Sequence, residues 1–178
     1  AERILGILFS QFWESTEQLW KDMSFEDIYQ TVNMASLIEK ETAQPEERRL
    51  ISGVFHNRLD RNMLLQCDPT IIYGLGLEFD GNLRRVHLED RENEYNTYRH
   101  RGFPPTPICS PGLASLEAAL NPEDHDYLYF VSRNDGSHHF SKNLKPQKIN
   151  LCKSIFVVKD GRFPISGRCS WFGGIRDR

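Results

Sequence analysis

The sequence predicts an α+β fold in which helices pack around a central helix and against a small antiparallel β-sheet. Apolar residues recur at helical spacing through residues 2–62 and again through residues 110–120. Residues 127–132 are rich in strand formers, and a turn signal separates them from a returning segment at 138–141. At 178 residues the chain has room for one ordinary domain with a small appendage.

The composition is that of a globular protein, with 39% hydrophobic residues, 26% charged residues and a net charge of −3. Positive and negative charges are mixed without a basic block, which argues against nucleic acid as a partner. No apolar run approaches the length of a membrane span, and no signal peptide is visible. We therefore expect a soluble chain, either whole or cut from a protein whose targeting segment lies outside it.

The four cysteines, Cys67, Cys109, Cys152 and Cys169, are far apart in the sequence. They form no C-x-x-C pair and no Cys/His spacing typical of zinc, so no metal site is expected. They could form two disulfides or remain four thiols, and we favour free thiols.

Three helices are expected in the first third of the chain. The first covers residues 2–20 and has a broad apolar face. The second covers residues 25–43, with Ser24 as its N-cap and Asp27 three residues later, close to a capping box. Pro45 opens the third, which ends near residue 62.

The second of these helices carries the most informative residue, Glu39. On a helical wheel at about 100° per residue, Glu39 falls on the core-facing arc between Ile28 and Val32, and Lys40 points away. Desolvation would raise the pKa of such a carboxyl and make it a general acid near neutral pH. A solvated glutamate or half of an i,i+4 pair is the structural alternative, and Glu41 lies near the same arc.

Two further segments combine polar and aromatic residues. Asp68-Pro69 signals a turn or a helix start, and Gln66 and Asp68 either bond the local backbone or line a cleft. Residues 77–94 are expected to be a surface excursion. Residues 95–107 form a proline-stiffened loop with Tyr95, Asn96 and Tyr98, which suits a sugar-binding wall or a packed structural loop.

The last third of the chain is expected to contain a helix and hairpins. Ser110 is the predicted N-cap and Pro111 the first residue of the helix that precedes the 127–141 hairpin. His138 and His139 point to opposite faces of a strand, so they are a poor metal pair. We divide the chain into a main domain, residues 1–152, and a C-terminal β-hairpin extension or stub of a further domain, residues 153–178.

Seven segments of the chain form a set of motifs, at residues 35–42, 54–59, 65–74, 95–98, 102–105, 110–112 and 127–131. Taken together, they resemble the YceG-like, or MltG, family of endolytic murein transglycosylases. They occur in the family's order and near its spacing, and the resemblance covers roughly residues 1–150. The chain departs from the family pattern at Cys67, where a threonine is usual, and at Gln147, where a histidine is common.

The resemblance implies an enzyme that cleaves peptidoglycan glycan strands between N-acetylmuramic acid and N-acetylglucosamine and leaves a 1,6-anhydro end. The family's catalytic glutamate matches Glu39. Family members act outside the cytoplasm, in the periplasm, and are anchored in the bacterial inner membrane by an N-terminal helix, which we do not expect within these 178 residues. Cell-wall synthesis proteins are candidate partners.

In this interpretation Glu39 first protonates the glycosidic oxygen and then takes the proton of the attacking C6 hydroxyl, with no metal or organic cofactor. Residues expected to hold the sugar or orient Glu39 are Gln66, Asp68, Tyr73, Tyr95, Asn96, Tyr98 and Ser110. Asp68 as a second acid would instead make a hydrolase.

Two other classes of protein remain alternatives. A non-catalytic peptidoglycan-binding module would need the aromatic loop but not Glu39. An aminodeoxychorismate-lyase-like enzyme would need pyridoxal phosphate, a Schiff-base lysine and a phosphate cradle. The sequence has no glycine-rich cradle, and Lys40 lies on the solvent side of its helix.

Overall fold

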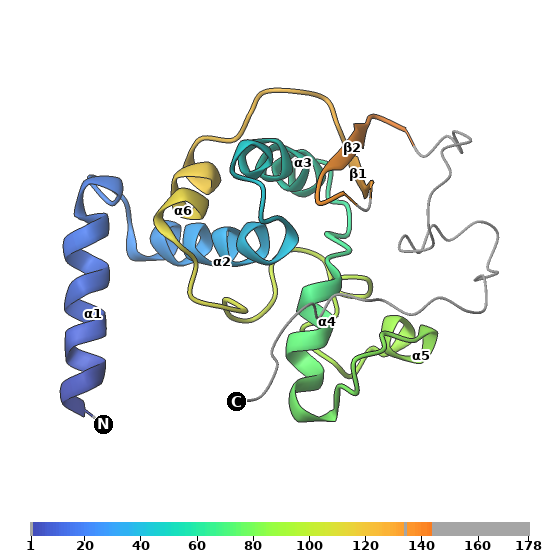
Figure 1. Cartoon of the computed structure of the whole chain (residues 1–178), viewed down its shortest axis with the longest axis horizontal. Coiled ribbons are helices and arrows are strands. Elements are labelled where there is room, and N and C mark those ends of the chain that lie inside the picture. The colour runs from blue at the N-terminus through green and yellow to red at the C-terminus, as the bar shows by residue number, and fades with distance from the viewer. Residues whose placement is uncertain (1, 134, 144–178) are drawn as a thin grey trace.

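A computed structural model of the chain describes residues 2–133 and 135–143, and Figure 1 shows its arrangement. Short 3₁₀ turns follow α1, precede α3 and follow α4, at η1 (Glu17–Leu19), η2 (Pro45–Glu47) and η3 (Gly76–Glu78). The main elements are α1 (Glu2–Thr16), α2 (Phe25–Glu41), α3 (Arg48–Asp60), α4 (Asp68–Leu75), α5 (Arg85–Glu89), α6 (Leu113–Leu120), β1 (Tyr129–Ser132) and β2 (His138–Ser141). The predicted α+β class is confirmed.

Helix α2 is the central element, in contact with α3, α4 and α6. It begins with the predicted capping box, in which the Ser24 hydroxyl accepts a hydrogen bond from the Asp27 amide at 3.1 Å. It ends at Thr42, whose amide donates to the Ile38 carbonyl. Both ends of the helix that carries Glu39 are therefore fixed by the local sequence.

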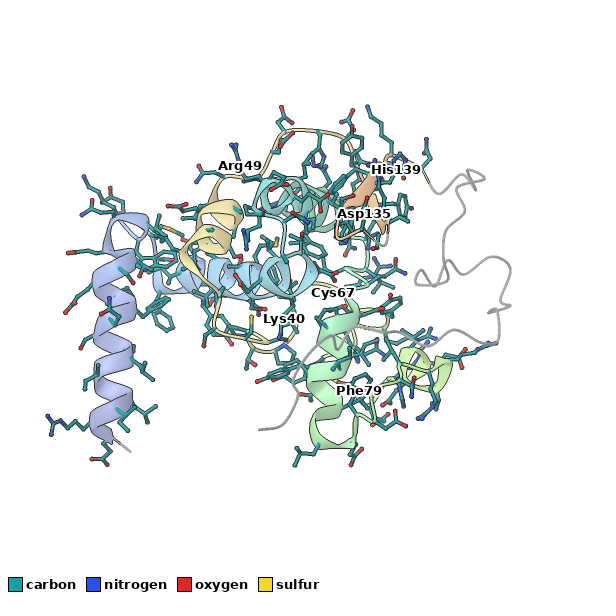
Figure 2. The ribbon with its side chains drawn as sticks, in the orientation of Figure 1. Lys40, Arg49, Cys67, Phe79, Asp135 and His139 are labelled. Carbon is teal, nitrogen blue, oxygen red and sulfur yellow. The ribbon has the colours of Figure 1, made fainter. Side chains whose placement is uncertain are left out.

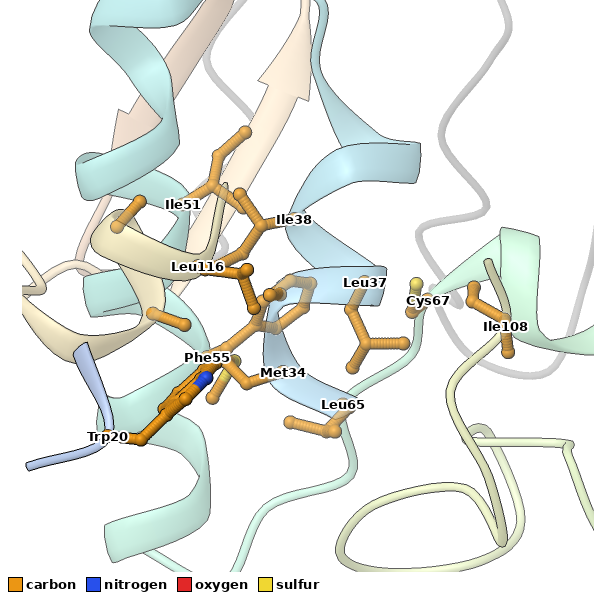
Figure 3. Packing of buried hydrophobic residues seen from close by; sticks show 13 residues of the cluster. Trp20, Met34, Leu37, Ile38, Ile51, Phe55, Leu65, Cys67, Ile108 and Leu116 are labelled. Carbon is orange, nitrogen blue, oxygen red and sulfur yellow. The ribbon is translucent and has the colours of Figure 1, made fainter. Parts of the chain in front are cut away.

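The hydrophobic core lies between α2, α3 and α6. Leu37, Ile51 and Phe55 are fully buried, and Leu116 of α6 closes the cluster from the third helix (Figure 3). Burying each such side chain stabilises the fold by about 1.5–3 kcal/mol. This packing makes α2 a rigid support for the polar residues at its C-terminal end.

The loop that precedes α6 runs along one side of α2. The Tyr29 hydroxyl donates to the Pro105 carbonyl at 2.8 Å, and the side-chain amide of Asn33 donates to the Pro104 carbonyl at 2.8 Å. Further along, the Ile108 amide donates to the Ser36 hydroxyl at 3.0 Å. The proline-rich loop is therefore a structural partner of α2 and brings the start of α6 to Glu39.

Strands β1 and β2 form the predicted antiparallel hairpin, in which Ser132 pairs with His138. The hairpin is attached to the helices through Glu47, which accepts from the His138 amide at 2.8 Å and contacts the His138 ring nitrogen Nδ1 at 2.6 Å. His138 is buried and His139 is half-buried, as expected for adjacent strand residues.

The structure corrects the predicted start of the helix that precedes the hairpin. Helix α6 has Gly112 as its N-cap rather than Ser110, because the Gly112 carbonyl accepts the first helical hydrogen bonds, from Ser115 and Leu116.

Cys67 and Cys109 are free thiols. Cys152, Cys169, Gln147 and the proposed extension at 153–178 lie outside the described residues. Within the described part of the chain, no helix is long and apolar enough to cross a membrane.

Candidate functional site

Glu39 is half-buried near the C-terminal end of α2, where α6 begins. Its Oε2 atom accepts hydrogen bonds from the Ser115 hydroxyl at 2.6 Å and from the Gly112 amide at 3.2 Å. Ser115 occupies the first turn of α6, so the hydroxyl and the amide converge on one oxygen. No described residue forms a hydrogen bond with Oε1, which leaves that atom available to a ligand.

These donors determine the charge of Glu39. The Ser115 hydrogen bond lowers the pKa of Glu39 most, and the Gly112 amide and the cations Arg48 and Lys40 lower it further, against the opposing effect of burial. The expectation that desolvation would raise the pKa of Glu39 is therefore wrong for the free protein. Its carboxyl is ionised at neutral pH because donors that favour the charged form outweigh burial.

Glu41, two residues later on α2, has different neighbours, and its pKa shifts in the opposite direction. Burial raises the pKa of Glu41 to about 7, with a contribution from nearby Asp68. The Cys67 thiol, which donates a hydrogen bond to the Glu41 carboxyl, and the Arg58 cation oppose this rise. The raised pKa that periodicity suggested for Glu39 is thus found at Glu41.

Asp68 and Tyr98 lie near Glu41 and Cys67, at the start of α4, and form an acidic group with them. The Tyr98 hydroxyl donates to Asp68 Oδ1 at 2.5 Å. Burial raises the pKa of Asp68, and this outweighs the Tyr98 hydrogen bond. Arg58 does not pair with these acids, because its guanidinium donates to the carbonyls of Leu65 at 2.6 Å and Leu128 at 2.7 Å.

Gln66 lies beside this acidic group in an unusual backbone conformation. Its φ of 52° is in the left-handed region, which a non-glycine residue adopts at a cost. The backbone amide of Gln66 donates to the Thr97 carbonyl at 3.1 Å, and this bond holds the conformation. Its side chain is exposed and has no hydrogen-bond partner among the described residues, so it is free to contact a ligand.

Tyr73 and Tyr95 form an aromatic pair between α4 and the loop. Their ring centroids lie 4.9 Å apart, and Tyr73 is 47% exposed. The Tyr95 hydroxyl is 2.9 Å from the Thr106 hydroxyl. A solvent-exposed ring fixed by a second ring is suited to stacking against a sugar.

The two remaining predicted residues have different environments. Asn96 is fully buried, and its amide donates to the carbonyls of His87 and Asp90 at 3.0 and 2.5 Å, which favours a folding role. Ser110 is exposed two residues before the N-cap of α6. The serine that contacts Glu39 is Ser115.

Sequence reasoning missed Ser115 because it lies in an alanine- and leucine-rich helix where a serine gives no signal. It also missed Arg48, whose charge acts on Glu39 although the two residues are nine positions apart. Figure 2 shows the side chains, including the exposed Lys40 that follows Glu39. In the described part of the chain, no group of three or more His, Cys, Asp or Glu side chains could hold a metal ion.

Comparisons with known proteins agree on one family. A family model described as YceG-like matches residues 1–153. The chain is 43% identical over 132 residues to an endolytic murein transglycosylase of Bacillus subtilis, covering 73% of this chain and 35% of that protein. It is 34% identical over 133 residues to an endolytic murein transglycosylase of Streptococcus pneumoniae, covering 72% of this chain and 24% of that protein.

Among solved structures, the fold is similar to the crystal structure of a YceG-like protein from Listeria monocytogenes. The TM-score is 0.62 at 38% sequence identity, and the match covers 78% of this chain and 42% of that chain. The chain therefore spans less than half the length of each of these relatives.

Proposed function

The chain belongs to the YceG-like family, and we propose that it is the catalytic part of an endolytic peptidoglycan lytic transglycosylase. The proposed reaction cleaves the bond between N-acetylmuramic acid and N-acetylglucosamine in glycan strands and leaves a 1,6-anhydro end. The observation that carries this proposal is the half-buried Glu39, which two donors hold by one oxygen at the position matching the family's catalytic glutamate. Relatives named endolytic murein transglycosylases support it.

In the proposed mechanism Glu39 acts twice. Its protonated carboxyl gives a proton to the glycosidic oxygen as the C1–O bond breaks. The resulting carboxylate takes the proton from the C6 hydroxyl of the same muramoyl residue, and that oxygen bonds to C1 to close the anhydro ring. The attack is intramolecular, so proximity replaces a bound water and a second carboxylate. The reaction needs no metal or organic cofactor.

The free protein holds Glu39 as a carboxylate, so protonation must accompany binding of the strand. A glycan that covers Glu39 removes water from the carboxyl, and desolvation favours the neutral acid. Ser115 and Gly112 hold Oε2 throughout, which directs Oε1 toward the glycosidic oxygen. After proton transfer the same donors stabilise the carboxylate that deprotonates the C6 hydroxyl.

Four of the predicted substrate-binding residues have exposed or partly exposed side chains that suit contact with a glycan. In this proposal the Tyr73–Tyr95 pair stacks against a sugar ring, and Gln66 and Ser110 offer hydrogen bonds to it. Asp68 and Tyr98 fix the base of α4 beside them. Because peptidoglycan lies outside the cytoplasm, we place the activity there.

A hydrolase is the second candidate function. The observation in its favour is that burial raises the pKa of both Glu41 and Asp68, which lie toward the start of α4 rather than at the start of α6. In a hydrolase one of these carboxyls, when protonated, would give its proton to the glycosidic oxygen, and a carboxylate would take a proton from the attacking water, as in ordinary glycosidases.

Digestion of polymeric, uncrosslinked peptidoglycan, with products read by mass spectrometry, separates these functions. Fragments with anhydro ends are expected from a transglycosylase. Reducing ends that carry an added water would indicate a hydrolase and direct attention to Asp68. Tight binding to the strands without any cleavage would indicate a non-catalytic peptidoglycan-binding module.

A further inference from the structure

Arg48 has no hydrogen-bond or ion-pair partner in the described part of the chain, and its charge acts on the proposed catalytic carboxyl. It is the first residue of α3, which packs against both α2 and α6, and its positive charge acts on Glu39. Its side-chain Nε is buried and has no hydrogen-bond partner. Among the described residues, none accepts a hydrogen bond from the guanidinium or forms an ion pair with it.

The other two arginines of α3 both have hydrogen-bond acceptors for their guanidinium groups. The buried Arg58 donates to the carbonyls of Leu65 and Leu128. The exposed Arg49, labelled in Figure 2, donates from Nε to the Asn121 carbonyl at 2.8 Å. A buried N–H donor left without an acceptor costs free energy, so the protein does not satisfy the Arg48 guanidinium on its own. The terminal nitrogens of Arg48 are not buried and have no partner among the described residues, so they can meet an acceptor that arrives with a ligand.

The charges around Glu39 indicate what kind of acceptor would be favoured. Lys40 and Arg48 are the two cations that act on Glu39, so one carboxylate faces two positive charges. The planar guanidinium fork binds a carboxylate with two parallel hydrogen bonds, which a lysine cannot reproduce, and it also donates to a single carbonyl oxygen. A ligand oxygen with negative or partial negative charge therefore fits beside Glu39.

We propose that Arg48 binds the lactyl group on C3 of the muramoyl residue whose glycosidic oxygen Glu39 protonates, and that it thereby selects muramoyl over glucosaminyl residues. This inference rests on the proposed function. The lactyl group is the part of this sugar that N-acetylglucosamine lacks. Its acceptor is an amide carbonyl where the strand carries peptides and a carboxylate where the peptides have been removed.

The test compares Arg48→Gln, Arg48→Lys and the matched control Arg49→Gln by steady-state kinetics on peptide-bearing and peptide-free strands. Arg48→Gln should raise KM on the order of tenfold to a hundredfold, the usual effect of losing a charge-assisted hydrogen bond. The rise should be larger on peptide-free strands because their acceptor is fully charged. The KM of Arg48→Lys should lie between those of Arg48→Gln and the unaltered protein. The KM of Arg49→Gln should equal that of the unaltered protein.

A binding experiment covers the case in which Arg48→Gln folds poorly. Glu39→Gln and Glu39→Gln/Arg48→Lys, both checked for folding by circular dichroism, are titrated with peptide-free strands and with chito-oligosaccharides, which lack the lactyl group. The lysine change should weaken binding of the strands and leave chito-oligosaccharide binding unchanged.

Equal KM values for the Arg48 and Arg49 variants would overturn the inference. So would a fall in kcat with unchanged KM and a shifted pH profile, because Arg48 would then act only on Glu39. Either result leaves the proposed function intact if the unaltered protein forms anhydro ends. Absence of those ends would instead count against the proposed function.

Discussion

At Glu39 the hydrogen bonds and the proposed chemistry favour different protonation states. Ser115 and Gly112 donate to one oxygen and stabilise the carboxylate, whereas the first proposed step needs the acid. Fixing one oxygen orients the other, and orientation lowers the reaction barrier in addition to any effect of the pKa. The donors then stabilise the charged product of the first step.

Ser115→Ala tests this assignment at the level of one hydroxyl. Loss of the 2.6 Å hydrogen bond should raise the pKa of Glu39, so the alkaline fall in kcat/KM should move to higher pH. The maximal rate should drop about tenfold, because the carboxyl loses its orientation. The measurement is the pH–rate profile. Ser15→Ala, which changes an exposed hydroxyl on α1, serves as the control. An unshifted profile would show that Ser115 does not control Glu39.

At the scale of elements, α2 carries two glutamates whose surroundings differ. Glu39 meets donors at the start of α6, and Glu41 meets Cys67 and Asp68 at the start of α4. Side chains two positions apart on a helix diverge by roughly 200°. The helix therefore separates an ionised carboxyl from one that is half protonated near neutral pH.

The Glu41 environment predicts a pH-dependent stability. Its pKa rises from 4.5 to about 7 on folding, so the folded protein holds a proton that the unfolded chain has released. Stability should therefore fall as pH rises from about 4.5 through 7, by up to about 3 kcal/mol. Denaturant unfolding at pH 5 and pH 8 should show this loss, and Glu41→Gln should reduce it. The exposed Glu46→Gln is the control, and an equal loss in both variants would contradict the assignment.

Local signals in the sequence were sufficient for much of α2 and the hairpin. The Ser24 cap and the apolar stripe predicted α2 within two residues, and alternation with an Asp-Gly turn predicted the β1–β2 pair. The start of α6 was misplaced because Ser110-Pro111-Gly112 contains two plausible caps. The structure identifies Gly112 by the helical hydrogen bonds that its carbonyl accepts, and its amide also contacts Glu39.

The candidate site was predictable in its residue types but not in its electrostatics. A helical wheel placed Glu39 near the core, yet it could not show that a hydroxyl 76 positions away would lower its pKa. The same limit hid the burial of Asn96 and the unpaired state of Arg48. These properties arise from segments distant in sequence, which periodicity does not report.

At the scale of the whole molecule, the hairpin and the helices are joined through the buried pair of Glu47 and His138. Figure 1 shows β1 and β2 beside α3, and Phe130 packs its ring edge-on against Phe55 at 5.9 Å. Glu47 immediately precedes α3, so this contact ties the hairpin to the start of that helix. The hairpin is thus attached to α3, which packs against the helix that carries Glu39.

His138→Ala should therefore destabilise the protein by about 2 kcal/mol, because a buried carboxylate oxygen of Glu47 loses its closest donor. The adjacent His139→Ala, on the opposite face of β2, should have little effect. Thermal and denaturant unfolding of the two variants provides the comparison. Equal destabilisation would mean that the His138–Glu47 contact contributes no more than any hairpin side chain.

The most direct test of the central claim compares Glu39→Gln with Glu41→Gln in the same peptidoglycan digest, with both variants confirmed as folded. If Glu39 transfers the proton, its variant should lose anhydro-ended products by at least about a hundredfold, the usual contribution of a general acid. Glu41→Gln should still form them at neutral pH. Loss of products from Glu41→Gln together with their retention by Glu39→Gln would contradict the account and move the chemistry to the Glu41 side of α2.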